Sequence, residues 1–338
     1  MERDTQIERW LAGLLPGREF RLAPAAADAS FRRYLRATFA DGGALIVMDA
    51  PPSHEDVGRW LHVQRLFRGA GAHVPEVLAE DVERGFLLLS DLGSTTYLAA
   101  LNAGATDNEA DTLYRAAIDT LIAIQRGSRP DALPAYDRVL LRRELDLFPD
   151  WYIGRHVAVD FGASDRNMLE TVFERILAAN LAEPVVHVHR DYHSRNLMVD
   201  GARPDAPGVI DFQDAVCGPI SYDLVSLFKD AYVDWEEERT LDWLARYWEK
   251  AKKAGLPVRA DFGDFFRDYE WMGVQRHVKV LGIFARLFHR DGKDGYLQDL
   301  PRVAKYLRAA CARYGELAPL LRLLDRLENR QAQVGCTF

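Results

Sequence analysis

The first ninety residues alternate apolar and polar positions in a way that predicts a small sheet with one helix. A turn at 41–43 (Asp-Gly-Gly) separates the first two expected strands. A helix is expected over about 54–68, where apolar residues recur on one side. The expected strands are 31–39, 44–48, 76–80 and 86–90. The order strand, strand, helix, strand, strand therefore predicts a sheet with the helix packed against it.

Helical periodicity dominates the rest of the chain, apart from one β-rich island at 184–212. Helices are expected at about 109–126, 138–156, 164–181, 222–230, 236–254, 262–288, 296–314 and 317–330, and strands in the island at 185–188, 197–199 and 208–212. Residues 91–94 look like a connector. The pattern predicts an α+β, two-lobed protein with a small lobe at 1–90 and a larger, mainly helical lobe at 91–338.

Composition and charge argue against some classes of binding partner. The net charge is −8 and no basic tract is present, which argues against a nucleic-acid partner. Three widely spaced cysteines, Cys217, Cys311 and Cys336, support neither a disulfide framework nor a metal-binding pair. The chain start lacks the pattern of a signal peptide, and no uncharged apolar stretch is long enough to span a membrane. We expect a cytoplasmic protein with no membrane partner.

The chemistry is concentrated in the β-rich island. His189-Arg190-Asp191 is followed five residues later by Asn196, and Asp211 ends the next expected strand. This spacing fits the H-R-D-x-x-x-x-N and D-F-x elements of phosphotransferases. Hard oxygen ligands such as Asn196 and Asp211 suit Mg²⁺, and Asp191 can accept a proton from an acceptor hydroxyl.

Two other interpretations of the island are open. Asp and Asn can simply satisfy backbone amides in an ordinary turn. His187, His189 and His193 could be zinc ligands, although no fourth ligand has a suggestive spacing. A GxxxxGK[ST] motif is absent, so a P-loop protein is excluded.

These motifs resemble the aminoglycoside phosphotransferase-like small-molecule kinases, which have a protein-kinase-like bilobal fold. The resemblance rests on SFRRY (30–34), IVMDAPP (46–52), HRDYHSRNLM (189–198), IDFQDAVCGPISYDLVSLFK (210–229) and QRHVKVLGIFARL (275–287). The second and last are similar to the branch that phosphorylates the anomeric hydroxyl of N-acetylmuramate or N-acetylglucosamine in cell-wall recycling. The resemblance implies ATP and an amino sugar as partners and Mg²⁺ as cofactor, and we expect a monomer.

Other functions of the same fold are open at this point. They are a kinase for another small alcohol, such as an aminoglycoside, choline or homoserine, and a nucleotide-binding pseudokinase. Only twelve residues separate Asp211 from Asp223, which leaves no room for a long activation loop. A protein substrate is therefore not expected.

The resemblance also implies roles for individual residues. Asp191 is the expected catalytic base, Asn196 and Asp211 are the expected Mg²⁺ ligands, and His189 and Asp223 are expected to support the catalytic loop. The small lobe, 1–90, is the expected nucleotide-binding lobe, with a hinge at 90–94. The expected ATP contacts are Ser30, Phe31, Arg32, Arg33, Met48, Ser90, Asp91, Leu92, Met198 and Ile210.

One departure from the family pattern concerns the phosphate-binding lysine. The family usually has a lysine on the third strand, paired with a glutamate on the next helix. Here Met48 or Asp49 stands at the lysine position, and the helix position falls near Trp60. Arg32 and Arg33 are the candidate replacements, unless they belong to a solvated strand face.

The acceptor site is expected in the larger lobe. Glu144, Trp151 and Tyr152 could hold a sugar by hydrogen bonds and ring stacking, or could be a capped helix and core aromatics. The other expected acceptor contacts are His193, Arg195, Gln213, Arg276 and His277. Either Arg276 and His277 or Arg195 could face a lactyl carboxylate. Asp146, Asp150 and Asp214 would instead suit a cationic acceptor.

Overall fold

The computed structural model describes residues 2–26, 31–201, 203 and 205–334. The chain divides into two compact units, each described here by itself. Unit 1 is Met1–Gly127 with Arg195–Asp214, and unit 2 is Ser128–Ser194 with Ala215–Phe338. Part of the β-rich island therefore belongs to unit 1. The hinge expected at 90–94 stays a prediction.

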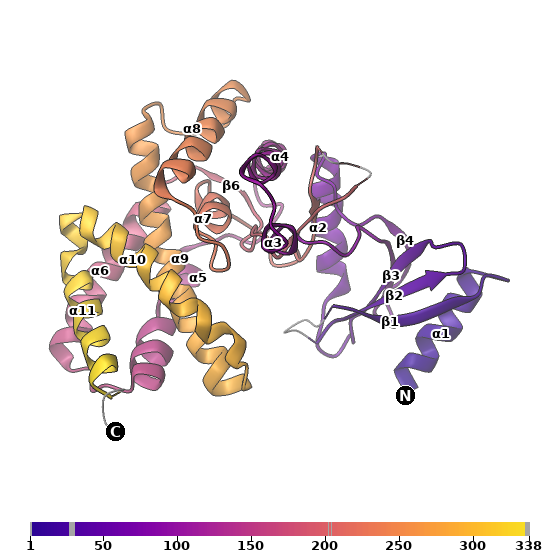
Figure 1. Cartoon of the computed structure of the whole chain (residues 1–338), viewed down its shortest axis with the longest axis horizontal. Helices are drawn as coiled ribbons and strands as arrows, with labels where there is room; N and C mark the ends of the chain where they lie inside the picture. The colour runs from indigo at the N-terminus through magenta and orange to yellow at the C-terminus, as the bar shows by residue number, and fades with distance from the viewer. Residues whose placement is uncertain (1, 27–30, 202, 204, 335–338) are drawn as a thin grey trace. The chain divides into compact units, whose positions relative to one another are not determined.

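Unit 1 is built on a five-stranded antiparallel sheet with the order β1-β2-β3-β5-β4. Its strands are β1 (Phe20–Ala26), β2 (Arg33–Phe39), β3 (Ala44–Asp49), β4 (Val77–Asp81) and β5 (Phe86–Ser90). Helix α1 (Glu2–Leu14) packs on one face, where Ile7 and Leu11 meet Val47, Phe86 and Leu88 (Figure 1). Alternate residues of each strand therefore face α1.

The strand β1 was not predicted from the sequence. Its residues, FRLAPAA, include Pro24 and several small side chains, which weaken the strand pattern. β1 lies at the edge of the sheet, and an edge strand is where a proline can be accommodated.

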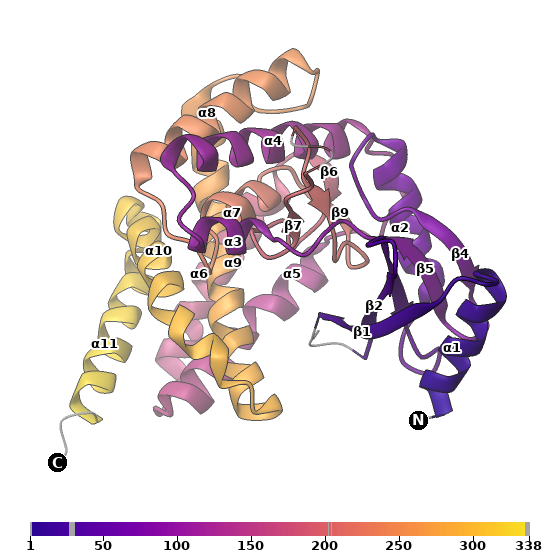
Figure 2. The same cartoon turned by 45° about the vertical axis from the view of Figure 1, so that its right-hand side comes forward.

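Three helices and a short hairpin complete unit 1 (Figure 2). The helices are α2 (Val57–Gly69), α3 (Tyr97–Asn102) and α4 (Asp107–Arg126), and the hairpin joins β7 (Leu197–Met198) to β8 (Gly208–Val209). Asp56 caps α2, and a capping box of Thr106 and Glu109 starts α4. Backbone bridges from Thr96 to Met198 and from His73 to Gly208 attach the hairpin to the rest of the unit.

Unit 2 is mainly helical. Its elements are α5 (Arg138–Leu145), the π-helical segment η1 (Phe148–Val157), α6 (Ala163–Leu181), α7 (Tyr222–Phe228), α8 (Glu237–Lys253), α9 (Phe262–Asp291), η2 (Asp294–Asp299), α10 (Leu300–Arg313), η3 (Gly315–Leu317), α11 (Ala318–Val334), and the strand pair β6 (Val185–Val188) and β9 (Val216–Pro219). The 30-residue α9 is central, because nearly all its side chains from Tyr269 to Ala285 are buried. A helix buried on all sides is the core of its domain.

The stretch expected as one helix over 138–156 is helical almost throughout, but it is divided into an α-helical and a π-helical part. α5 ends at Leu145, and η1 begins with Pro149 in its first turn. Proline lacks the N–H that a continuing helix needs, so the α-helix cannot run through this position. No helix among the described ranges is long and apolar enough to cross a membrane.

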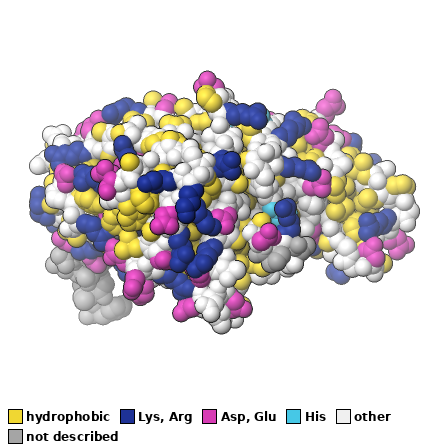
Figure 3. Space-filling view, turned by 90° about the horizontal axis from the view of Figure 1, so that it is seen from above, with side chains coloured by type: hydrophobic (Ala, Val, Ile, Leu, Met, Phe, Trp, Pro, Cys, Tyr) yellow, Lys and Arg dark blue, Asp and Glu magenta, His cyan; other side chains and the backbone are white. Residues whose placement is uncertain are grey.

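The surface carries charges of both signs. Lys and Arg side chains are interspersed with Asp and Glu side chains on the face drawn in Figure 3. Exposed pairs such as Arg138–Glu174 and Arg246–Asp242 are typical. Each exposed pair contributes only about 0–1 kcal/mol, so these surface pairs add little to the stability of the fold.

Candidate active site

Two buried carboxylates anchor the segment that carries Asp191. Asp223, in the first turn of α7, accepts hydrogen bonds from the backbone N–H groups of His189 (2.7 Å) and Arg190 (3.0 Å). Asp230 accepts from the backbone N–H of Ser194 (3.0 Å) and from its hydroxyl. Both ends of the segment are therefore fixed to α7 and the residues that follow it.

Arg190 holds a strained backbone conformation within this segment. Its φ is +77°, a region that costs a non-glycine residue about 1 kcal/mol or more. The backbone bond to Asp223 and an ion pair between its guanidinium and Glu144 (2.5 Å) stabilise that conformation. The strained turn sets the direction of the next residue, Asp191.

The Asp191 carboxylate faces cations. Its side chain is 44% exposed, and a guanidinium nitrogen of Arg276 lies 3.7 Å from one carboxylate oxygen. Burial alone would raise the pKa of Asp191, but Lys279, Arg276 and other nearby cations outweigh it and hold the pKa well below its usual range. Asp191 is therefore ionised at any pH near neutrality.

A buried polar network lies behind Asp191. The hydroxyl of Tyr222 accepts hydrogen bonds from Arg276 (3.1 Å) and Lys279 (2.9 Å), two residues one turn apart on α9. Lys279 also pairs with Glu144 at 3.1 Å, and Arg276 donates to the backbone oxygen of Arg190 at 2.9 Å. The network joins α9 to the segment that carries Asp191.

Glu144 is the anion at the centre of this network. Its carboxylate pairs with Lys279 and Arg190 and accepts hydrogen bonds from Gln275 and Tyr136. Burial opposes its ionisation, but the attraction of Lys279 and Arg190 is stronger, and the pKa of Glu144 is lowered. These contacts favour a structural role for Glu144 over the sugar contact that the sequence suggested.

Two other expected acceptor contacts, Arg276 and His277, are also held in the protein interior. The guanidinium of Arg276 is buried and binds Arg190, Tyr222 and Asp191. His277 is buried and stacks on Tyr306 with 5.3 Å between the ring centroids. Burial lowers the pKa of His277 well below its usual value, so this ring is neutral and suits a carboxylate poorly.

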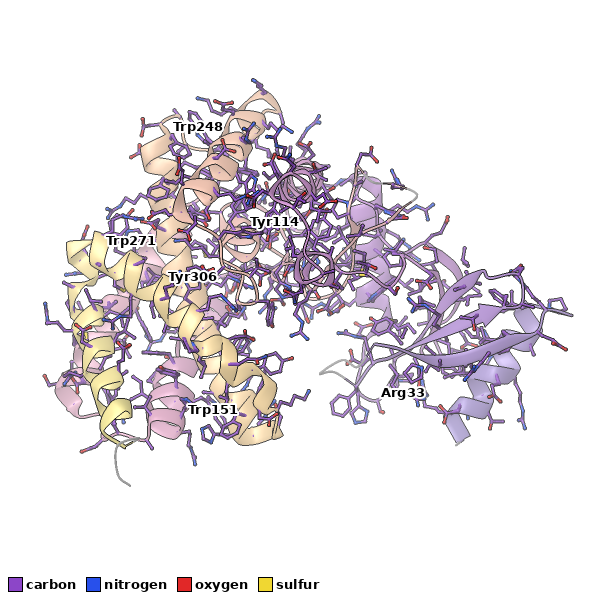
Figure 4. All side chains as sticks on the ribbon, viewed as in Figure 1. Arg33, Tyr114, Trp151, Trp248, Trp271 and Tyr306 are labelled. Atoms are coloured by element: carbon purple, nitrogen blue, oxygen red, sulfur yellow. The ribbon has the colours of Figure 1, made fainter. Side chains whose placement is uncertain are left out.

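The aromatic candidates lie on η1. Tyr152 is buried and stacks between Phe148 (5.3 Å) and His156 (5.7 Å). Trp151 is half-buried, and Figure 4 shows it on the segment beside α9. Trp151 is therefore the more accessible of the two rings for a sugar face. His193, also half-buried, packs edge-to-face on Tyr232.

In unit 1, the β7–β8 hairpin brings Asn196 and Asp211 together. Asn196 immediately precedes β7, Asp211 follows β8 by two residues, and a backbone bond from Ile210 to Asn196 (3.1 Å) joins the two ends. The Asn196 amide nitrogen lies 3.4 Å from one oxygen of Asp211, and Gln213 donates to the other at 2.9 Å. The Asp211 side chain is 37% exposed, so a ligand can reach it.

The donor atoms of this pair fit Mg²⁺. Carboxylate and amide oxygens are hard ligands, and Mg²⁺ commonly takes only one or two protein side chains and completes its shell with phosphate and water.

A zinc site is not supported: no group of three or more His, Cys, Asp or Glu able to hold a metal occurs among the described residues. His187 accepts from the N–H of Arg129, and His189 from that of Asp191.

The other expected nucleotide contacts differ in burial and in hydrogen bonding. Ser90 and Glu76 exchange backbone and side-chain hydrogen bonds, and the carboxylate of Asp91 binds Arg36. Met48, Leu92 and Met198 are buried, Arg195 and Phe31 are exposed, and Ser30 lies outside the described residues. The nucleotide contacts expected in this stretch therefore stay predictions.

Sequence reasoning missed several residues of the network. Asp230 directly follows the 210–229 motif, and Lys279 follows Arg276 by three residues, which is one helical turn. That spacing was the available signal for Lys279. Tyr222 gave none, because a tyrosine in a hydrophobic helix usually packs in the core.

The H-R-D segment, the Asn196–Asp211 pair and the sheet-plus-helix units define a kinase-like phosphotransferase. The chain belongs to the phosphotransferase enzyme family, whose model matches residues 21–262. The N-acetylmuramate/N-acetylglucosamine kinase of Neisseria meningitidis serogroup B is 48% identical over 339 residues and 100% of both chains. A Pseudomonas aeruginosa protein with the same name is 51% identical over 306 residues, covering 90% of this chain and 88% of its own.

A solved structure supports the fold. ADP-bound aminoglycoside phosphotransferase APH(2'')-Ib has a TM-score of 0.60 to this chain at 14% identity, covering 90% of this chain and 97% of its own. At this identity the likeness concerns the fold alone.

Proposed function

We propose that this protein transfers the γ-phosphate of ATP to the anomeric hydroxyl of N-acetylmuramate and N-acetylglucosamine. The observation that carries the proposal is the 48% identity over the whole chain to a relative of that name. The ionised Asp191 beside Arg276 and the paired Asn196 and Asp211 supply the chemical groups that such a reaction needs.

In the proposed reaction Asp191 receives a hydrogen bond from the acceptor hydroxyl and takes its proton. A carboxylate held by cations is a weak base. A weak base suits this acceptor for two reasons. Phosphoryl transfer has a loose transition state in which the proton leaves late, and an anomeric hydroxyl is more acidic than an ordinary alcohol because the ring oxygen withdraws electrons.

Asn196 and Asp211 would hold Mg²⁺ in this reaction. When bound, the ion neutralises phosphate charge. Gln213, which donates to Asp211 at 2.9 Å, would orient the carboxylate. We expect the enzyme to act as a monomer, which sedimentation at working concentration can test.

The test is an acceptor panel with ATP and Mg²⁺, read by ADP release and by phosphorus NMR. We expect turnover with N-acetylmuramate and N-acetylglucosamine, and a product whose phosphorus couples to the anomeric proton. The methyl glycoside of N-acetylglucosamine, whose anomeric oxygen is blocked, is the matched control and should give no product. Preference for an aminoglycoside or choline, or phosphorylation of the methyl glycoside, would refute the proposal.

A further inference from the structure

Unit 1 contains no lysine. In residues 1–127 and 195–214, arginine is the only side chain with a permanent positive charge. Strand β3, where the family usually has its lysine, ends in Met48-Asp49. An enzyme that handles ATP must neutralise the phosphates with cations as well as metal. On this unit that side-chain cation therefore has to be an arginine.

The neighbouring arginines Arg32 and Arg33 have separate partners. Arg33 opens β2 and lies opposite Asp49 of β3, and its guanidinium donates twice to that buried carboxylate (3.0 and 2.6 Å). Arg3 of α1 binds the same carboxylate (Figure 4 shows Arg33 on the sheet). Arg33 thus belongs to the α1 side of the sheet, where its charge is already neutralised by Asp49.

Arg32 has its partners elsewhere, because successive residues of extended chain point to opposite sides. One of its terminal nitrogens pairs with Glu55 at 3.2 Å, and the other lies 3.7 Å from Asp211. The Arg32 side chain is only 9% exposed. The guanidinium therefore lies between a glutamate and the expected metal ligand.

A second contact fixes the same stretch of chain. The ring of Phe31 packs on that of His54 with 4.4 Å between centroids, so Phe31-Arg32 contacts His54-Glu55 residue by residue. A guanidinium has five N–H donors in a rigid fork, more than one carboxylate can accept, and the fork matches phosphate geometry. Glu55 can orient Arg32 while other donors of the fork bind phosphate.

We propose that Arg32 is the phosphate-binding cation of this enzyme and that Glu55 is its positioning residue. Together they replace the lysine–glutamate pair that is usual in the family. The inference rests on the proposed function in one respect, since it takes ATP as the phosphate donor.

Calorimetric titration without any sugar tests the proposal. ATP, ADP and adenosine are titrated, with Mg²⁺ present, into the full-length protein and the variants Arg32→Gln, Arg32→Lys, Glu55→Gln and Arg33→Gln. Arg32→Gln should weaken ATP about tenfold to a hundredfold, as expected for loss of a charge-assisted hydrogen bond, and leave adenosine within about twofold. Arg32→Lys should restore part of the loss.

The remaining variants separate positioning from general damage. In a separate turnover assay with N-acetylglucosamine as acceptor, Glu55→Gln should raise the KM for ATP about threefold to tenfold, with less effect on kcat. In the titration, the double variant Arg32→Gln/Glu55→Gln should bind ATP no more weakly than Arg32→Gln alone. Arg18→Gln, which removes an exposed pair with Asp41, is the control and should bind ATP normally. Arg33→Gln should lower thermal stability and keep ATP affinity.

Several outcomes would overturn the proposal. They are unchanged ATP affinity in Arg32→Gln, an equal loss for ATP and adenosine, or an ATP-specific loss in Arg33→Gln. If Arg32→Gln does not fold, the ATP affinities of Arg32→Lys and Glu55→Gln are compared with that of the wild type instead. A wild-type protein that binds no nucleotide would instead contradict the proposed function, so the two failures are distinguishable.

Discussion

The guanidinium of Arg276 lies 3.7 Å from the carboxylate of Asp191, and the Tyr222 hydroxyl joins Arg276 to Lys279 one turn further along α9. The proposed catalytic base is thus held by a cation that is itself fixed in the protein core. This arrangement keeps Asp191 ionised and sets its orientation. It also makes the base sensitive to residues that never reach the substrate.

Replacing Asp191 by Asn should nearly abolish turnover. The amide cannot take a proton, so kcat should fall about a hundredfold to ten-thousandfold. Thermal stability should fall modestly, because the cations that lower the pKa of Asp191 lose their anion, and ATP affinity should hardly change. ADP release and calorimetry measure both effects, and Asp160→Asn, at an exposed position, is the control. Wild-type turnover in Asp191→Asn would remove the general-base role.

Replacing Arg276 by Gln should move the acid limb of the pH–rate profile upward. Arg276 is one of the cations that hold the pKa of Asp191 below its usual range. Without Arg276 the pKa of Asp191 rises. On acidification, the kcat/KM of Arg276→Gln should therefore begin to fall at a higher pH than that of the wild type. Turnover near neutral pH should also fall, by about tenfold, because the carboxylate loses its fixed partner.

Arg276→Lys is the matched variant, since it keeps the positive charge. Its acid limb should stay close to that of the wild type even if kcat drops. The measurement is kcat/KM from about pH 3, or the lowest pH at which the enzyme stays folded, to about pH 8, a range that includes the usual aspartate pKa of about 3.9. Identical acid limbs in Arg276→Gln and the wild type would show that Arg276 does not tune Asp191.

Glu183 makes folding stability depend on pH. Burial raises the pKa of Glu183 to about 8, against its usual 4.5, although the N–H of Ser221 bonds to it at 3.1 Å. Between these values the folded protein binds a proton that the unfolded chain has released. This contribution to stability is therefore full below about pH 4.5 and is lost as the pH rises towards 8.

The variant Glu183→Gln should remove that loss. Gln keeps the acceptor for Ser221 and carries no charge, so it should be more stable than the wild type at pH 8, by roughly 1–4 kcal/mol, and about equal below pH 4.5. Urea unfolding across this range measures the difference. Glu249→Gln, at an exposed site of α8, should show no such trend; a pH-independent difference for Glu183→Gln would contradict the prediction.

Two glycines of α9 should respond to alanine with opposite signs. A Cβ on Gly282 would come within 2.5 Å of the backbone of Leu147, so Gly282→Ala must displace η1 or α9 and should cost about 1–3 kcal/mol or more. A Cβ on Gly273 would meet its nearest atoms at 3.7 Å or more. Gly273→Ala should therefore stabilise the helix by up to about 1 kcal/mol. Thermal unfolding of both variants checks the sign.

The core of the candidate site was predictable from short-range patterns. Asn196 and Asp211 flank one hairpin, and a hairpin brings its two ends together whatever surrounds it. The buried Asp223 was likewise found, because the motif around it is local. For these residues the distance along the chain already limits the distance in space.

The long-range contacts were not predictable in the same way. Glu144 lies 131 residues from Gln275, and its role depends on which face of α9 meets α5. Arg32 and Arg33 look alike in the sequence, and only the β2–β3 register separates them by placing Arg33 opposite Asp49. Such assignments need the packing of whole elements, which no local pattern contains.

The absence of lysine from residues 1–127 and 195–214 has a practical consequence for chemical probes. Nucleotide analogues with amine-acylating warheads, which label kinases through the strand lysine, would meet no primary side-chain amine on unit 1. A guanidinium remains protonated and is a poor nucleophile. Covalent probes directed at unit 1 will therefore need a reactive group that does not depend on a lysine.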